Sequence, residues 1–225
     1  MADARTESET DAPAKVAGRQ LVYFADPMCS WCYGFSPVIG EIARRFEGRM
    51  PVRIVMGGLR AGNERPMRDA DRDYIRSAWT RVAAASGQPF DHAFFERESF
   101  VYDTEPACRS VVTMRRRAPE RALEFLTRVS RAFYAENRDT TKASELAKLA
   151  AEFGEDADAF ELAMLDPEMR NATLRDFLLA QQSGVSGFPC LVAGREADGY
   201  ALVTSGFATL DTLIEPIETW YAGQA

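Results

Sequence analysis

Two cysteines separated by two residues are the groups in this 225-residue chain whose spacing most directly suggests chemistry. They stand in DPMCSWC, residues 26–32, directly after the apolar run of residues 20–25. A pair with this spacing can be a redox-active dithiol, half of a zinc site or a structural pair. The elements around Cys29 and Cys32 decide among these possibilities.

A zinc site would need two further ligands at a matching spacing. The other cysteines, Cys108 and Cys190, stand singly and far along the chain, and His92 is the only histidine. We therefore expect no metal site and a surface position for His92. Cys108 and Cys190 are expected to be buried thiols. A redox role for Cys108 stays open if its helix packs over the dithiol, and so does a redox or metal role for Cys190.

The dithiol falls where a strand passes into a helix. Residues 20–25 are apolar and typical of a buried strand, and apolar residues then recur at spacings of three and four from Cys29 to about residue 46. Residues 50–59 predict a second strand that ends in two glycines. The order strand, helix, strand places the two thiols at the N-terminus of the helix.

A helix N-terminus stabilises a thiolate through its unpaired N–H groups and the helix macrodipole. Cys29 is therefore expected to attack disulfides, and Cys32, one turn further on, to resolve the mixed disulfide. Asp26 is a possible base for this chemistry. A role as a turn or helix-capping residue is an equally good interpretation of Asp26.

The rest of the chain divides into a helical block and a second stretch of strands. Residues 66–183 are expected to be helical almost throughout, and Arg115, Arg116 and Arg117 are expected to form a solvated helix end. Two short strands at 187–194 and 200–206 and a final helix follow. We predict a disordered tail at 1–18, a discontinuous α/β domain formed by 19–65 and 184–225, and a helical insertion domain at 66–183.

These residues together resemble the thioredoxin superfamily. The resemblance rests on the strand, the C-x-x-C at the helix start, Pro37 after the second cysteine, and the late Gly-Phe-Pro of residues 187–189. The large helical insertion makes the chain similar to the DsbA-like branch. DPMCSWCYGF and the GGLR of residues 57–60 are most similar to cytosolic members described as disulfide isomerases, including FrnE-like proteins.

The resemblance implies a thioredoxin fold with roles for particular residues. Pro189 would be a cis-proline packed against the dithiol, and Phe188 would offer its backbone to a substrate strand. Trp31 is expected to be exposed and, with Ser30, to contact substrate and to set the redox potential. Pro37 would kink the helix.

The chain departs from thioredoxin and DsbA at two points. Tyr23 stands where both relatives have a buried acid. The dipeptide between the cysteines contains no histidine, so a more reducing couple than that of DsbA is expected.

Composition limits the partners. The formal net charge is −7, which disfavours nucleic acid and anionic membranes as partners. No apolar run approaches the roughly 20 residues of a membrane span. The first 18 residues show no apolar segment of a secretory signal, so we expect a cytoplasmic protein.

We therefore predict a thiol–disulfide oxidoreductase that reduces or isomerises disulfides of proteins or small molecules. No cofactor is expected beyond the Cys29–Cys32 pair, with glutathione as a candidate co-substrate and a thiol as reductant. Two alternatives stay open. One is a glutathione-dependent isomerase or transferase, which commonly lacks the second cysteine. The other is a non-catalytic adaptor that presents proteins to a chaperone or protease.

Overall fold

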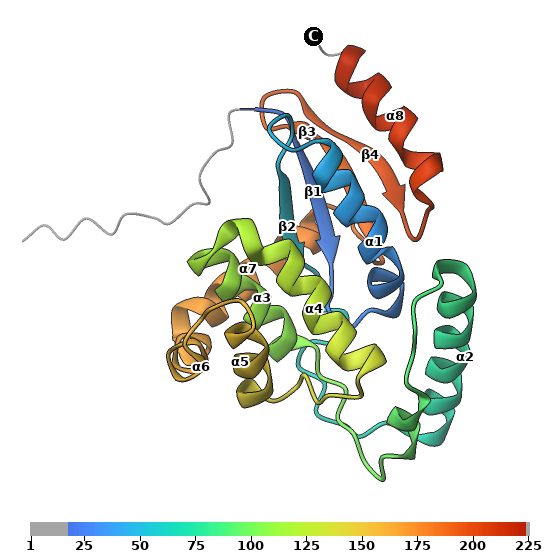
Figure 1. Cartoon of the computed structure of the whole chain (residues 1–225), viewed down its shortest axis with the longest axis vertical. Coiled ribbons are helices and arrows are strands. Elements are labelled where there is room, and N and C mark those ends of the chain that lie inside the picture. The colour runs from blue at the N-terminus through green and yellow to red at the C-terminus, as the bar shows by residue number, and fades with distance from the viewer. Residues whose placement is uncertain (1–17, 224–225) are drawn as a thin grey trace, which may run out of the picture.

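The computed structural model describes residues 18–223, so the predicted tail lies outside the described residues except for Gly18. A mixed sheet of four strands in the order β2-β1-β3-β4 forms the centre (Figure 1). The strands are β1 (Gln20–Ala25), β2 (Val52–Met56), β3 (Cys190–Arg195) and β4 (Gly199–Ser205). The two stretches that form this sheet are therefore separated by more than 130 residues of intervening chain.

The pairing of the strands follows from their burial. All six residues of β1 are buried, as expected for a central strand that pairs on both sides. β1 runs parallel to β2 and antiparallel to β3, and β3 pairs with β4 through a tight turn. Gly199 in this turn has a φ of 86°, which favours glycine. β4 is exposed over most of its length and forms one edge of the sheet.

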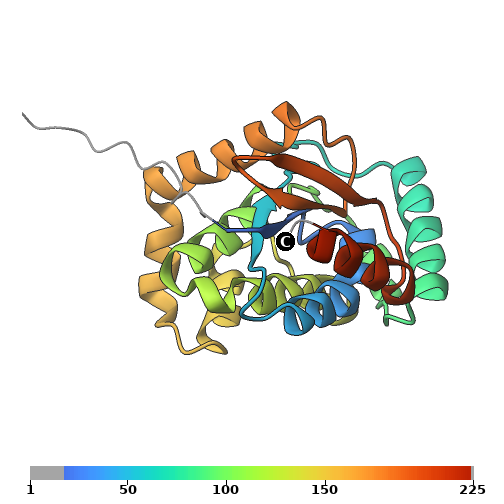
Figure 2. The same cartoon turned by 90° about the horizontal axis from the view of Figure 1, so that it is seen from above.

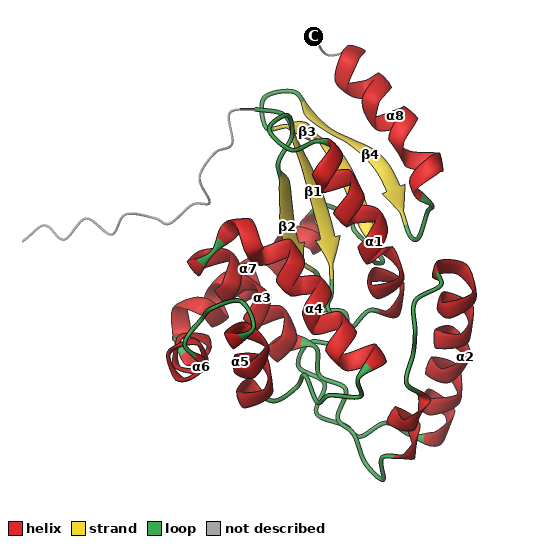
Figure 3. Ribbon diagram, viewed as in Figure 1, coloured by secondary structure: helices red, strands yellow, loops and turns green. Residues whose placement is uncertain are grey.

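Helices cover the sheet unevenly. α1 and α8 lie against one face, and α7 lies on the other side near β2 (Figures 1 and 2). The helices between β2 and β3 gather around the end of the sheet where β1 finishes, as the red ribbons of Figure 3 show. The α-helices of the described chain are α1 Ser30–Arg45, α2 Asp69–Ser86, α3 Glu105–Arg117, α4 Ala122–Ala135, α5 Ala143–Ala151, α6 Ala157–Leu165, α7 Pro167–Gln182 and α8 Leu210–Gly223.

The active-site helix α1 continues through Pro37, which lies inside it. Proline cannot donate the backbone hydrogen bond that the carbonyl of Tyr33 would normally accept. The hydroxyl of Ser36 donates to that carbonyl instead, at 2.7 Å. This replacement satisfies the carbonyl, so the helix accommodates the proline without ending.

The prediction of a helix almost throughout 66–183 is wrong for residues 87–104. This stretch contains only a short 3-10 helix, η1 (His92–Glu96), and an isolated bridge between Pro66 and Val101. Gly87, with a φ of 72°, ends α2, and the aromatic side chains that follow pack inward. Burial of these rings positions a segment that lacks the periodicity of a helix.

The prediction of a solvated helix end at residues 115–117 is wrong for Arg115, which is paired with a buried acid. It donates to both carboxylate oxygens of Asp176 at 2.8 and 3.1 Å, and to the carbonyl of Ile54. Asp176 also accepts from the backbone N–H of Met56 at 2.8 Å. This arginine therefore joins α3, α7 and β2 instead of lying free in water.

One continuous cluster of buried apolar residues connects the sheet with the helical block. It includes Leu21 of β1 and Phe35 of α1, together with Phe125 of α4 and Leu149 of α5. A second, smaller cluster lies on the opposite face of the sheet, around Phe24 and Val55. The predicted α/β fold with a helical insertion is confirmed, while the exact domain ranges remain a prediction.

Candidate active site

Cys29 is the residue at which β1 and its following turn pass into α1. Its backbone is extended, with φ −94° and ψ 118°, so it forms the N-cap of the helix. The turn is held by its N–H, which donates to the carbonyl of Asp26 at 3.0 Å. Its Sγ lies 3.5 Å from the carbonyl oxygen of Phe188. The Phe188–Pro189 peptide is cis, as predicted, and brings the start of β3 against this thiol.

Cys32 lies one turn further into α1 and is buried. Burial raises the pKa of its thiol well above the ordinary value, and its hydrogen bond with Cys29 raises it further. A hydrogen bond from the backbone of Asp26 acts in the opposite direction and favours the thiolate. Cys32 therefore needs a proton acceptor before it can attack. Both cysteines are free thiols in this structure.

Tyr23 occupies the position at which the resemblance would place a buried acid. Its side chain is buried against the dithiol and hydrogen bonds with Cys32. Burial, with the nearby thiols, raises the pKa of the Tyr23 hydroxyl well above its ordinary value. Tyr23 thus stays protonated and cannot accept the proton of Cys32.

Asp26 is fully buried beside the dithiol and holds several elements together. One carboxylate oxygen accepts from the N–H of Met28 at 2.8 Å, and the other accepts from the N–H of Leu59 at 2.7 Å. The thiol of Cys108 lies 3.5 Å from the second oxygen. Burial raises the pKa of Asp26 although these hydrogen bonds lower it. Asp26 therefore holds the turn, as predicted, and its raised pKa brings its titration closer to neutral pH than that of an ordinary aspartate.

The helical block contributes residues that sequence reasoning did not identify. The hydroxyl of Tyr102 donates to the carbonyl of Met28 at 2.7 Å, and it lies 3.1 Å from the hydroxyl of Tyr134. Arg60 lies over the ring of Tyr102, 5.1 Å from its centroid. Only the richness of this stretch in aromatic residues could have indicated such contacts. The backbone that positions Cys29 is thus supported from the insertion.

The residues expected to contact substrate lie at the rim of the dithiol. Trp31 was expected to be exposed, but it is half-buried, with its ring 5.7 Å from that of Phe207. Ser30 is also half-buried. The ring of Phe188 packs directly on Gly57, where a Cβ would approach it to 2.0 Å. Gly57 is therefore needed for the close approach of this ring.

The two remaining cysteines lie in different surroundings. Cys108, on α3, is buried beside Asp26, which meets the condition under which a redox role stayed open. Cys190 is also buried, but it belongs to the cluster on the opposite face of the sheet from the dithiol. His92 is exposed at the start of η1, as predicted. Within residues 18–223, no three His, Cys, Asp or Glu side chains gather in a way that could hold a metal ion.

This arrangement supplies the parts of a dithiol exchange site. The Cys29 thiol lies at the N-terminus of α1 beside the carbonyl of Phe188, and the Cys32 thiol is close enough to hydrogen bond with Cys29. The buried carboxyl of Asp26 lies three residues before Cys29 in the chain, and its charge raises the pKa of Cys32. None of the helices within the described part of the chain is long and apolar enough to cross a bilayer.

Comparison with known proteins agrees with this geometry. Residues 20–218 match the DSBA-like thioredoxin domain, and the chain belongs to this family of thiol–disulfide oxidoreductases. A candidate protein disulfide isomerase from Nitrosomonas europaea is 35% identical, with a TM-score of 0.85 over 92% of this chain and 100% of that one. The cytosolic disulfide reductase DsbM from Pseudomonas aeruginosa is 28% identical, with a TM-score of 0.70 over 91% and 96% of the two chains.

Two further comparisons concern possible partners. The DsbM reductase has also been solved with glutathione, and that structure gives a TM-score of 0.68. The ClpXP adapter protein SpxH of Bacillus subtilis is 21% identical over 174 residues, which cover 76% of this chain. The match spans only 57% of the length of that adapter.

Proposed function

We propose that this protein is a cytoplasmic reductase or isomerase of protein or small-molecule disulfides, with Cys29 as nucleophile and Cys32 as resolving thiol. The single observation that carries this proposal is the position of Cys29, at the start of α1 and 3.5 Å from the Phe188 carbonyl. A substrate chain that pairs with the backbone of Phe188 would bring its disulfide to this thiol. The similarity to a cytosolic reductase supports the direction and the compartment.

The proposed reaction moves two electrons from the dithiol to the substrate. The Cys29 thiolate attacks one sulfur of the substrate disulfide, forms a mixed disulfide and displaces the first substrate thiolate, which takes up a proton. Cys32 then loses its proton to a base and attacks the sulfur of Cys29. The Cys29–Cys32 disulfide forms, and the second substrate thiol leaves. Two molecules of a thiol reductant restore the dithiol and become a disulfide themselves.

Glutathione is the reductant that we propose for this last step. The support is the similarity to DsbM, which has been solved with glutathione. Equilibration of the protein with glutathione buffers would give the potential of the Cys29–Cys32 couple. We expect a value within the cytosolic glutathione poise of about −220 to −320 mV. A value near that of an oxidant, about −120 mV, would contradict both the direction and the compartment.

Two serine variants test the assigned roles. Cys29→Ser should abolish the reduction of insulin disulfides, because no thiol then remains at the helix N-terminus. Cys32→Ser should retain the first attack and accumulate mixed disulfides on non-reducing gels. Retained insulin reduction in Cys29→Ser would contradict the assignment of the nucleophile.

A function as an adaptor is the second candidate, favoured by the similarity to SpxH. An adaptor would hold its partner without a covalent step. The double variant Cys29→Ser/Cys32→Ser distinguishes the two functions in pull-down experiments. If a partner stays bound to this variant as firmly as to the wild type, and the wild type does not reduce insulin, the adaptor is correct.

A further inference from the structure

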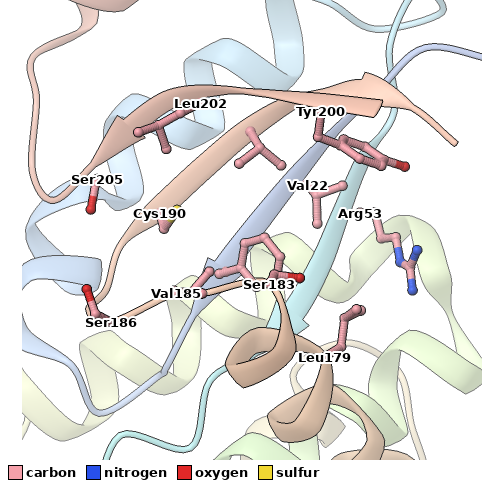
Figure 4. Close-up of a pocket in the computed structure, with 13 residues that line it drawn as sticks. Val22, Arg53, Leu179, Ser183, Val185, Ser186, Cys190, Tyr200, Leu202 and Ser205 are labelled. Carbon is pink, nitrogen blue, oxygen red and sulfur yellow. The ribbon is translucent and has the colours of Figure 1, made fainter. Parts of the chain in front are cut away.

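The sheet face opposite the dithiol contains a cavity that the redox chemistry does not use. Its volume is about 410 Å³, within the range of small-molecule sites in proteins. The side chains around it come from all four strands, from the end of α7 and from residues 183–186 (Figure 4). Cys190 lines it, while Cys29 and Cys32 pack in the cluster on the other face.

The strand register explains the apolar floor of this cavity. Arg53, Val22, Val192 and Leu202 are paired neighbours and form one row across the four strands. The next row contains Phe24, Cys190 and Ser205 on the neighbouring strands. An irregularity in the pairing of β3 with β4 lies between these rows, so Leu202 and Ser205 both line the cavity although three positions separate them.

Polar groups gather toward one end of the cavity. Arg53 and the hydroxyl of Tyr200 lie toward the same side in Figure 4, away from Ser186 and Ser205. The ring of Tyr200 folds over Gly194, where a Cβ would come within 2.6 Å of it. Gln20, in the same row, donates to the Tyr200 oxygen at 2.6 Å. Since that oxygen accepts from Gln20, the hydroxyl proton of Tyr200 is available to another acceptor.

Arg53 is a half-buried cation without a counter-charge in the described part of the chain. Its side chain forms no ion pair or hydrogen bond with residues 18–223, and no Asp or Glu lines the cavity. Several other half-buried arginines have partners: Arg115 and Arg138 are paired with carboxylates, and Arg72 and Arg97 donate to backbone carbonyls. A guanidinium at the edge of an apolar cavity is matched by an anion that carries an apolar body.

We propose that this cavity binds a small amphipathic carboxylate, with its carboxyl group on Arg53 and Tyr200 and its apolar body along Val22, Phe24 and Val192. The site is separate from the dithiol and does not depend on the proposed reductase function.

Titration calorimetry of the full chain with decanoate tests the proposal. We expect one decanoate per protein, and binding of decan-1-ol at least about tenfold weaker, because it lacks the charge that Arg53 would pair with. Arg53→Gln should weaken decanoate binding about tenfold or more, while Arg53→Lys should retain part of it. Arg65→Gln is the matched control, because Arg65 is exposed and does not line the cavity.

Each other outcome overturns the proposal. These outcomes are no heat of binding at millimolar decanoate, equal binding of decanoate and decan-1-ol, or equal loss in Arg53→Gln and Arg65→Gln. A further contrary outcome concerns oligomeric state. If the wild type sediments as a stable dimer and Leu202→Glu sediments as a monomer, a second copy of the chain covers this face. Cys29→Ser should bind decanoate like the wild type, so a failure of the reductase function leaves this test intact.

Discussion

Asp26 is the residue whose surroundings most directly connect structure with chemistry. Its two oxygens each accept one backbone N–H, and the thiol of Cys108 lies against the second. Because burial raises its pKa, it releases and accepts a proton at a higher pH than an ordinary aspartate. We infer that Asp26 accepts the proton of Cys32 before the resolving attack.

Asp26→Asn should slow the decay of the mixed disulfide at neutral pH by about 10²-fold, the usual contribution of a general base. In the wild type the rate of this step should rise with pH through the raised pKa of Asp26, and the variant should lack this rise. If Asp26 acted only through its charge, which raises the pKa of Cys32, its removal would speed the step instead. Stopped-flow measurement of mixed-disulfide decay across pH gives the sign.

The control for this variant is Asp156→Asn, since Asp156 accepts a backbone N–H at 2.8 Å at the start of α6 but lies far from the dithiol in sequence. Its pH profile should match that of the wild type.

The pH dependence of the stability of the fold should also change when Asp26 is replaced. Because the pKa of Asp26 is higher in the folded protein than its value of 3.8 in the unfolded chain, protonated Asp26 stabilises the fold at low pH. This stabilisation is complete below pH 3.8 and is lost as the pH rises through the folded-state pKa. Asp26→Asn should lack this loss in chemical unfolding at different pH values.

Local sequence identified the residues of the dithiol but not those that support it. Cys29, Cys32 and Pro189 follow from spacing and resemblance because short motifs specify them. Tyr102 and Tyr134 reach Met28 only through the folding of the insertion. Trp31 was placed wrongly because its partner, Phe207, comes from the far end of the chain. Contacts of this range leave no periodic pattern in the sequence.

At the level of elements, α1 and α2 approach each other closely at Gly34. A Cβ at this position would lie 2.7 Å from Cγ1 of Val82 and 3.2 Å from the Cβ of Ser86. Gly34→Ala should therefore lower the free energy of unfolding by about 1–3 kcal/mol through overpacking. Gly40→Ala, in the same helix and with open space around it, should raise that free energy by up to about 1 kcal/mol. Urea denaturation of both variants measures the difference, and equal effects would contradict the packing argument.

Asp176, a residue that is only 7% exposed, joins three elements through its carboxylate. Asp176→Ala leaves Arg115 without its counter-charge and the N–H of Met56 without an acceptor. We expect a loss of about 3–5 kcal/mol in the free energy of unfolding. Asp198→Ala removes the partner of Arg195 in an exposed pair and should cost less than about 1 kcal/mol. Comparable losses in guanidinium denaturation would show that burial is not the deciding factor.

The periodicity of apolar residues was enough to predict most helices, because each of them buries one face, and a continuous apolar run indicated β1, which is buried on both faces. It was insufficient for residues 87–104, where aromatic rings are buried without a regular spacing. The sequence pattern also gave the wrong environment for Arg115. A run of three arginines at a helix end does not reveal whether one of them pairs with an acid from a distant helix, as Arg115 does with Asp176 of α7.

For the molecule as a whole, the buried cluster that crosses from the sheet into the insertion predicts cooperative unfolding. Leu21, Phe35, Phe125 and Leu149 belong to that one cluster. The helical block and the sheet should therefore unfold in a single two-state transition. Thermal unfolding followed by far-ultraviolet circular dichroism and by tryptophan fluorescence should give coincident curves. Two separate transitions would instead support independent domains.

The position of β1 between β2 and β3 has a consequence for the synthesis of the protein. β1 and the dithiol leave the ribosome well before β3, the strand that pairs with the other edge of β1, which follows more than 150 residues later. At about 5–20 residues per second, that delay lasts on the order of 10–30 s. During this time Cys29 is present without Phe188, and an apolar strand edge is open to other chains. A nascent chain thus carries its thiols before it has a site, and the segment from Phe188 through β3 and β4 both closes the sheet and completes the site.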